Sequence, residues 1–137
     1  MENLHNTVKG LTALNPQEIT TDTTTVGATI DTAEASSVSF RVSAGAITDG
    51  DYTFQIFEDD DSGMGTETLV AATEVLGDKY NEVTNPTAGD LFTFGLIKNK
   101  RYARLKIVTA NVTSGGYCSA IAELANLRAS LATDRNP

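Results

Sequence analysis

The stretch that decides the fold class contains two segments, Ser37-Val-Ser-Phe-Arg-Val-Ser43 and Asp51-Tyr-Thr-Phe-Gln-Ile-Phe-Glu58. In both segments apolar side chains alternate with polar ones: Val38, Phe40 and Val42 in the first, and Tyr52, Phe54 and Ile56 in the second. A period of two residues indicates a β-strand with one buried face and one face in water. Asp49-Gly50 indicates a turn, because glycine accepts positive φ and aspartate bonds its own backbone. We therefore predict two strands joined by this turn, to which the rest of the chain adds further strands.

Similar alternation recurs along the 137-residue chain. It predicts strands over Leu91–Ile97 and Arg101–Thr109, joined into a hairpin by the tight turn Lys98-Asn-Lys100. Tyr117–Leu124 fits either a helix or a final strand, and we favour the strand. With shorter strands at Val26–Asp31 and Thr66–Leu76, the pattern predicts an all-β fold, an antiparallel β-sandwich of jelly-roll-like type with N- and C-terminal arms.

The expected domain organisation is an N-terminal arm over 1–18, a β-sandwich domain over 19–124 and a C-terminal tail over 125–137. The apolar residues of the two ends lie outside the strand pattern, so we expect them to contact a neighbouring copy or another protein. They are Leu4, Val8, Leu11, Leu127 and Leu131. The expected core consists of Phe40, Phe54, Ile56, Phe92, Phe94, Leu105 and Ile107.

Charge is plentiful and unevenly placed. The formal net charge is −8, which argues against nucleic-acid binding, since that requires clustered basic residues. Five of the ten basic residues fall in the predicted hairpin, which we interpret as a polar face or a subunit contact: Lys98, Lys100, Arg101, Arg104 and Lys106. Six of the eighteen acids fall in another: Asp49, Asp51, Glu58, Asp59, Asp60 and Asp61. This distribution predicts a dipolar domain.

Catalytic and metal motifs are not apparent. The single histidine, His5, lies in the expected arm, and no Gly-x-Ser-x-Gly motif is present, so we predict that the protein is not an enzyme. The run Glu58–Asp61 does not fit an EF-hand, because Leu69 would occupy the twelfth position. We interpret this run as a solvated loop without metal, while a cation site of another type stays open. No cofactor is expected.

Other sequence features indicate where in the cell the protein is expected to be made. Cys118 is the only cysteine, so no disulfide can form within the chain, and we expect a small half-buried residue in a strand. No apolar run approaches the ~20 residues that cross a membrane. The first residues lack the basic and apolar regions of a signal peptide. We therefore expect no membrane partner, and synthesis and assembly in a cytoplasm.

The order of several short motifs resembles that of small proteins encoded among the head genes of tailed bacteriophages. The similarity covers most of the chain from about Thr20, and departs at Gly95-Leu-Ile-Lys98, where the family pattern has Gly-Tyr-x-Gly. The motifs are a Thr-rich lead into Ile-Asp (Thr20–Asp31), Ser-Val-Ser-Phe (Ser37–Phe40), an Asp-Gly-x-Tyr-Thr turn and strand with an acidic end (Asp49–Asp61), Val-Leu-Gly (Val75–Gly77), Lys-Arg-Tyr-x-Arg (Lys100–Arg104) and a tail closing on Arg and Pro (Arg128–Pro137).

Proteins of this kind are similar to capsid decoration (cement or staple) proteins, which bind the exterior of the assembled head and bridge neighbouring capsomers. The resemblance implies a virion structural protein whose partner is the phage major capsid protein. Separately, the open edges of a sandwich with so few strands predict self-association as a dimer or trimer. It implies no catalytic residues. The alternative is another virion component on the same fold: a head-fibre base, a tail component, or a receptor- or glycan-binding module.

Overall fold

The structure is a computed structural model that describes residues 4–127. The prediction of an all-β fold is confirmed, because the elements that carry the architecture are strands and the helices are a few residues long. The elements are α1 (Leu4–Thr7), β1 (Val8–Ile19), β2 (Thr24–Val26), β3 (Ile30–Asp31), β4 (Ala35–Ile47), β5 (Asp51–Asp59), β6 (Thr68–Leu69), the 3-10 turn η1 (Ala72–Glu74), β7 (Val75–Leu76), β8 (Leu91–Leu96), β9 (Tyr102–Ala110) and β10 (Gly116–Leu127).

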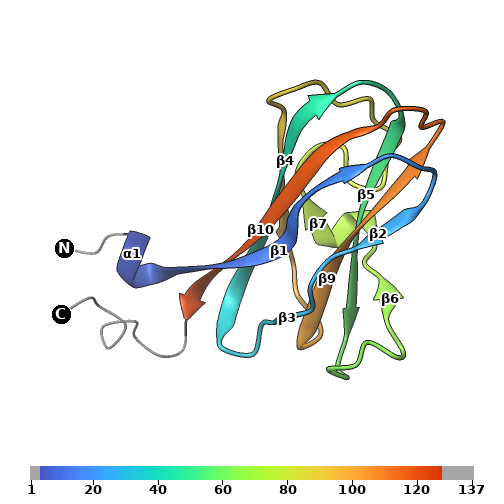
Figure 1. Cartoon of the computed structure of the whole chain (residues 1–137). Helices are drawn as coiled ribbons and strands as arrows, with labels where there is room; N and C mark the ends of the chain where they lie inside the picture. Colours follow the sequence, from blue (N-terminus) through green and yellow to red (C-terminus); the bar gives the residue numbers. More distant parts are fainter. Residues whose placement is uncertain (1–3, 128–137) are drawn as a thin grey trace.

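The strands form two antiparallel sheets (Figure 1). In the first sheet the order is β1-β10-β4-β8-β7, and in the second it is β2-β9-β5-β6, with β3 also paired to β9. The first and last strands of the chain, β1 and β10, are therefore neighbours. No helix in residues 4–127 has the length and apolar character that crossing a membrane requires.

The core lies between the inner faces of the two sheets. The ring of Phe54, on β5 of the second sheet, lies 4.9 Å from Phe92 and 5.9 Å from Phe94, both on β8 of the first sheet. Every predicted core residue is buried except Phe92, which is half-buried and packs against the core. The alternation in β4, β5, β8 and β9 thus identified the inward faces correctly.

The Asp49-Gly50 turn joins two strands as predicted, but these strands do not pair with each other. β4 pairs with β10 and β8, whereas β5 pairs with β9 and β6, so the Asp49-Gly50 turn carries the chain from one sheet to the other. The segment between β8 and β9 also crosses between the sheets, so the predicted hairpin over Lys98–Lys100 does not form. Alternation reports which face of a strand is buried, but it carries no information about which strand lies beside it.

Asp49 fixes the first of these crossings. Its carboxylate accepts main-chain amide hydrogen bonds from Thr113 at 3.1 Å, Ser114 at 3.1 Å and Gly115 at 2.8 Å. These donors, Gly115 foremost, hold the pKa of Asp49 below its usual range. Gly50 follows with a φ of 109°, a conformation that residues with a side chain rarely adopt. The turn is therefore tied to the loop between β9 and β10.

The ends of the chain differ from the expected arms. The segment expected as an arm over 1–18 is already in the first sheet from Val8, because β1 pairs along its length with β10. Register shifts between Thr12 and Leu14 and between Leu14 and Gln17 interrupt the alternation of β1, which hides the strand in the sequence. The strand favoured over Tyr117–Leu124 is confirmed and continues to Leu127. The rest of the predicted tail lies outside the described residues.

Candidate interaction surface

The outer side of the first sheet is a broad face that we call the first-sheet face. The register places residues of five strands on it, since directly paired residues share a side of the sheet. They are Val8, Gly10, Thr12 and Glu18 on β1; Tyr117, Ser119, Ile121, Glu123 and Ala125 on β10; Ser37, Ser39, Arg41 and Ser43 on β4; Leu91, Thr93 and Gly95 on β8; and Leu76 on β7.

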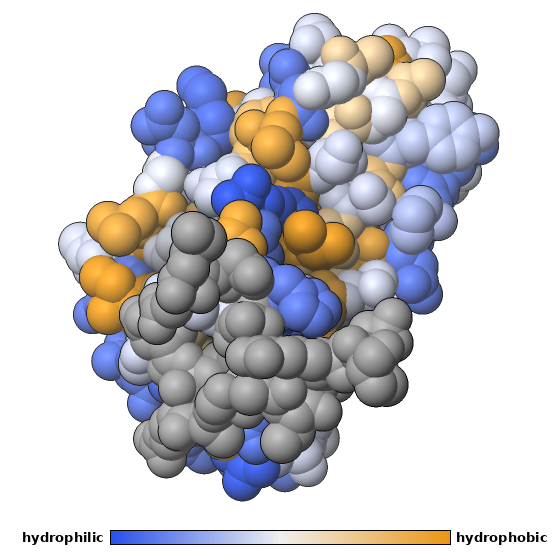
Figure 2. Space-filling view, turned by 90° about the vertical axis from the view of Figure 1, so that its left-hand side faces the viewer, coloured by the Kyte–Doolittle hydropathy of each residue, from blue (hydrophilic) through white to orange (hydrophobic). Residues whose placement is uncertain are grey.

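This face combines small side chains with a few large exposed apolar ones. Four large residues stand among the serines, threonines and glycines: Leu76 is 66% exposed, Leu91 57%, Tyr117 50% and Ile121 47%. Figure 2 shows this side of the molecule, with orange apolar side chains between pale and blue polar ones. Protruding apolar residues on a flat base are typical of protein interfaces, whose centres are depleted in charge.

The few charges on the first-sheet face are engaged with neighbours on the same face. The Arg41 Nε lies 2.6 Å from the Glu123 Oε1 across β4 and β10. The Tyr117 hydroxyl lies close to the carboxylate of Glu18, and this neighbour raises the pKa of Tyr117. No other charged side chain belongs to the set that the register places here. In a chain of net charge −8, this face is unusually low in net charge.

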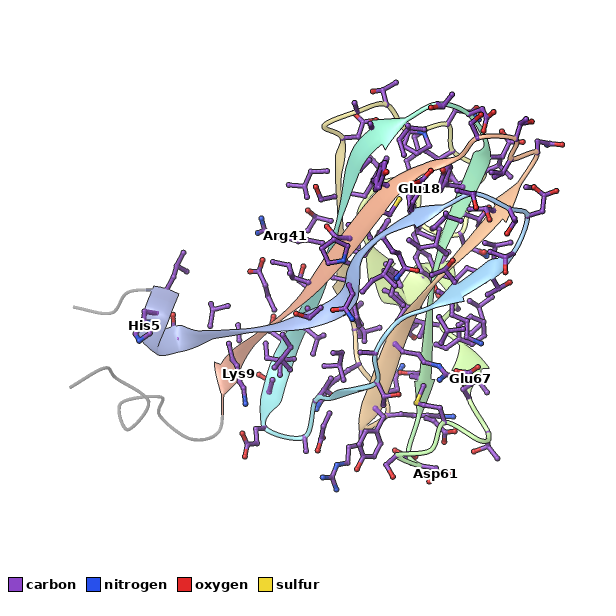
Figure 3. The ribbon with its side chains drawn as sticks, viewed as in Figure 1. His5, Lys9, Glu18, Arg41, Asp61 and Glu67 are labelled. Carbon is purple, nitrogen blue, oxygen red and sulfur yellow. The ribbon has the colours of Figure 1, made fainter. Side chains whose placement is uncertain are left out.

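The outer side of the second sheet is chemically different. Glu67 accepts a hydrogen bond of 2.8 Å from the Arg104 Nε and also binds the Lys106 ammonium, which lies 4.2 Å from the centre of the Phe57 ring. The Arg104 hydrogen bond is the main reason why the pKa of Glu67 falls below its usual range. Figure 3 shows Arg41 and Glu67 on opposite sides of the molecule. The two outer faces are thus a nearly neutral one and a charged one.

The basic residues predicted to form an interface have partners within the chain. Lys98 Nζ donates to the Thr32 carbonyl at 2.5 Å, and Lys100 Nζ lies 3.4 Å from the Thr68 hydroxyl. The remaining three bind acids: Arg101 forms two hydrogen bonds with Asp31, and Arg104 and Lys106 share Glu67. These contacts leave the basic segment less open to a partner, so its role as an interface stays a prediction.

The acidic run differs in part from the expected solvated loop. Glu58 and Asp59 are buried, and the Asp59 carboxylate accepts hydrogen bonds from the amide and hydroxyl of Thr66 at 2.8 and 2.9 Å. Glu58 accepts from the amide of Asn99 at 3.3 Å. Asp60 likewise accepts from the Arg101 amide, so the acidic and basic segments lie in contact. No metal-binding group of three or more His, Cys, Asp or Glu is found in residues 4–127.

The apolar residues predicted at the ends have different environments. Leu4 is 77% exposed in α1, whereas Val8 and Leu11 are half-buried on β1. Leu127 ends β10, opposite Ala35, and Leu131 lies outside the described residues. Of the predicted apolar interface, Leu4 is the residue that the described part of the chain leaves most open to a partner.

The exposed apolar residues of the first-sheet face that sequence reasoning missed are Leu76, Leu91, Tyr117 and Ile121. The signal for Tyr117 and Ile121 was present: once Tyr117–Leu124 is a strand, its odd-numbered positions face away from the core. Cys118 has the opposite orientation and is 2% exposed, with its pKa raised by burial to about 11, so its thiol is unreactive. His5 is exposed in α1.

Comparison with protein-family models, with curated proteins and with solved structures found no match for this chain.

Proposed function

We propose that this chain is a capsid decoration protein, a virion structural protein that binds the exterior of a bacteriophage head through its first-sheet face and bridges neighbouring major capsid proteins. The low charge of that face in an acidic chain is the observation that carries the proposal. A shell subunit that bound this face would bury Leu76, Leu91, Tyr117 and Ile121 beside Arg41 and Glu123, whose charges already pair with each other.

The orientation follows from the difference between the two outer faces. Docking of the first-sheet face leaves the charged side with Glu67, Arg104 and Lys106 in solvent. An outward charged face favours solubility of a densely covered particle. Many weak contacts repeated over a lattice add through avidity, so each copy needs only a modest interface.

The strand order supports a jelly-roll sandwich, a fold found in viral capsid and lectin domains. If β2 and β3 are counted as one strand and the short β7 is omitted, the remaining eight strands can be renumbered 1 to 8 along the chain. In these numbers the strand order of the first sheet is 1-8-3-6 and that of the second is 2-7-4-5. Two Greek keys wound together have this order. In this proposal α1, which Figure 1 shows beyond the main body, is the short N-terminal arm.

A second candidate is a glycan- or receptor-binding role in another virion part, such as a head-fibre base or a tail component. The pair of Tyr117 and Glu18 favours it, because an exposed ring beside a carboxylate can stack on a sugar and accept its hydroxyl hydrogen bonds. Copy number separates the two candidates. Decoration requires hundreds of copies per particle, whereas a fibre base or tail component requires few.

The test is rebinding of purified protein to particles that lack it. We expect Ile121→Asp to reduce rebinding about tenfold or more, because it replaces an exposed apolar side chain with a second carboxylate beside Arg41, which already pairs with Glu123. Val83→Asp is the matched control, since Val83 is 71% exposed and lies outside the first-sheet face.

Equal rebinding by both variants would contradict docking through this face. Quantitative staining of complete particles then checks the function itself. A count of a dozen copies or fewer would reject decoration and favour the second candidate.

A further inference from the structure

The first sheet has a long open edge. Its two outermost strands are β7, of two residues, and β1, of twelve. On the side of β1 away from β10, one main-chain hydrogen bond is found in the described part of the chain, from the Ala28 amide to the Ala13 carbonyl at 2.8 Å. Long edges without protection pair with other strands, and natural proteins therefore block or cover them.

Residues 4–127 protect the second half of β1 but leave the first half open. In the second half, Pro16 and the two register shifts between Thr12 and Gln17 prevent regular pairing with another strand. At the middle of β1, the Ala13 carbonyl already accepts a hydrogen bond from Ala28. From Val8 to Thr12 the strand keeps regular pairing with β10 and has no proline. Figure 1 shows α1 and the start of β1 extending beyond the other strands.

We propose that a second copy of this chain occupies this edge, by antiparallel pairing of Val8–Thr12 with the same five residues of its partner. When a strand pairs antiparallel with the same strand of a second copy, the two copies are related by a two-fold axis. Such an interface is complete in a dimer and adds no further copies. The two first sheets then form one continuous sheet across the axis. This dimer is independent of the proposed role on a capsid.

Gly10 is the natural centre of the pairing. It is the middle residue of the free stretch, and a Cβ built on it meets nothing within 4 Å. With the axis beside Gly10, the two Gly10 residues lie opposite each other, Lys9 lies opposite Leu11 of the partner, and Val8 lies opposite Thr12 of the partner. Two backbones approach closely at a residue without a side chain.

Charge complementarity favours a second copy over a foreign strand. Lys9 is exposed and Glu34 is exposed, and neither forms an ion pair in residues 4–127. Both line a cleft of about 460 Å³ beside β1, together with Leu11, Ile30 and Leu124. Figure 3 places Lys9 near the start of β1. In the two-fold arrangement each Lys9 faces the cleft of the partner, where a Glu34 is available.

The same arrangement covers exposed apolar surface. Antiparallel pairing carries the partner's chain past Thr12 toward the second half of β1, so that its α1 lies over this region. Leu4, 77% exposed in the single chain, then contacts the other copy. The pairing thus gives α1 a packing surface that a four-residue helix lacks on its own.

Disulfide trapping in the full chain tests the register. Opposed residues of antiparallel strands have Cα atoms about 4.5–5.5 Å apart, a separation that a disulfide spans. We expect Gly10→Cys to form a covalent dimer under mild oxidation, whereas Thr68→Cys, exposed on edge strand β6, stays monomeric in the same assay. Wild-type protein controls for Cys118, whose burial keeps it from reacting.

Charge exchange tests the complementarity. Lys9→Glu and Glu34→Lys should each weaken the dimer on the order of tenfold, because the axis repeats every contact twice. The double variant should restore the wild-type dissociation constant in sedimentation equilibrium, which a loss of folding could not produce. A monomeric wild-type protein, as expected if a foreign strand or the tail of the same chain covers the edge, overturns the proposal. A dimer in which the Gly10→Cys variant crosslinks no faster than the Thr68→Cys control also overturns it.

Discussion

The phenolic hydroxyl of Tyr80 donates a 2.7 Å hydrogen bond to the main-chain carbonyl of Val70. The same oxygen accepts a 3.2 Å hydrogen bond from the amide of Ile56 on β5. The Tyr80 ring also packs edge-on against Phe94 of the first sheet, with 5.9 Å between centroids. One side chain therefore fastens the irregular segment between β7 and β8 to both sheets.

Tyr80→Phe should lower the free energy of unfolding by about 1–3 kcal/mol, because it leaves buried main-chain groups without their partner. Tyr52→Phe is the matched control. The Tyr52 hydroxyl is also buried but has no hydrogen-bond partner within residues 4–127, so its removal breaks no hydrogen bond and should leave the free energy of unfolding unchanged or raise it. Urea denaturation measures both. Equal losses would mean that the Tyr80 contacts are not formed in solution.

Phe54→Ala should cost about 3–5 kcal/mol, because the side chain is fully buried and its ring contacts Phe92 and Phe94. Val83→Ala, at a residue that is 71% exposed, should change stability by less than about 0.5 kcal/mol. Chemical denaturation compares the two variants. A loss below about 1 kcal/mol for Phe54→Ala would place this ring outside the core.

Acid should remove the contribution of Glu67. Its pKa is lower in the folded chain than the unfolded value of about 4.3. It therefore stabilises the fold above that pH, and the contribution is lost as pH falls through the folded pKa. Glu67→Gln should be less stable than wild type at pH 7, and the difference should shrink below about pH 4.3. Denaturation over a pH series measures this.

Glu82→Gln is the control for the acid experiment, since Glu82 is exposed and forms no ion pair in the described part of the chain. Its stability should follow the wild-type pH profile. A difference between Glu67→Gln and wild type that stays constant down to strongly acidic pH would show that the Glu67 carboxylate is not the titrating group.

EDTA should leave the melting temperature unchanged, because the acidic run already has protein partners. Asp59 is held by Thr66, and Glu58 and Asp60 accept main-chain amides. Differential scanning calorimetry with EDTA and with added calcium measures the effect. A melting temperature that falls with EDTA and recovers with calcium would establish a cation site there.

Removal of α1 should lower the melting temperature much less than removal of β1. A chain beginning at Val8 keeps every strand and should melt close to the full-length protein. A chain beginning at Ile19 lacks β1, which contributes the buried Leu14, and that side chain alone is worth about 2–5 kcal/mol. Thermal unfolding compares the two. Similar melting temperatures would show that β1 adds little to the sheet.

The strand faces could be predicted from sequence, but the strand partners could not. Phe40 and Phe54 were placed correctly in the core because burial of one face imposes a period of two. Asp49-Gly50 forms a turn as expected, yet it joins different sheets. A turn motif sets the local path of the chain, whereas the choice of neighbour depends on contacts between distant strands.

The candidate site was harder to predict. The cluster of basic residues at 98–106 predicted an interface, but Arg101 and Arg104 bind acids that lie far away in the chain. The first-sheet face gathers Leu76 and Ile121 from strands separated by most of a sheet, so no short window contains them. Tyr80 lies in a segment without periodicity, and only its hydrogen bonds identify its role.

The pairing of β1 with β10 also bears on how the protein is made. β10 comes last in chain order among the strands of residues 4–127, yet it belongs in the interior of the first sheet, between β1 and β4. A nascent chain therefore holds β1 and β4 without their shared neighbour until β10 has been synthesised. A product that ends before Gly116 lacks β10 and cannot complete this sheet. We therefore expect prematurely terminated chains to stay incompletely folded and open to proteases, and not to compete with full-length protein for its binding sites.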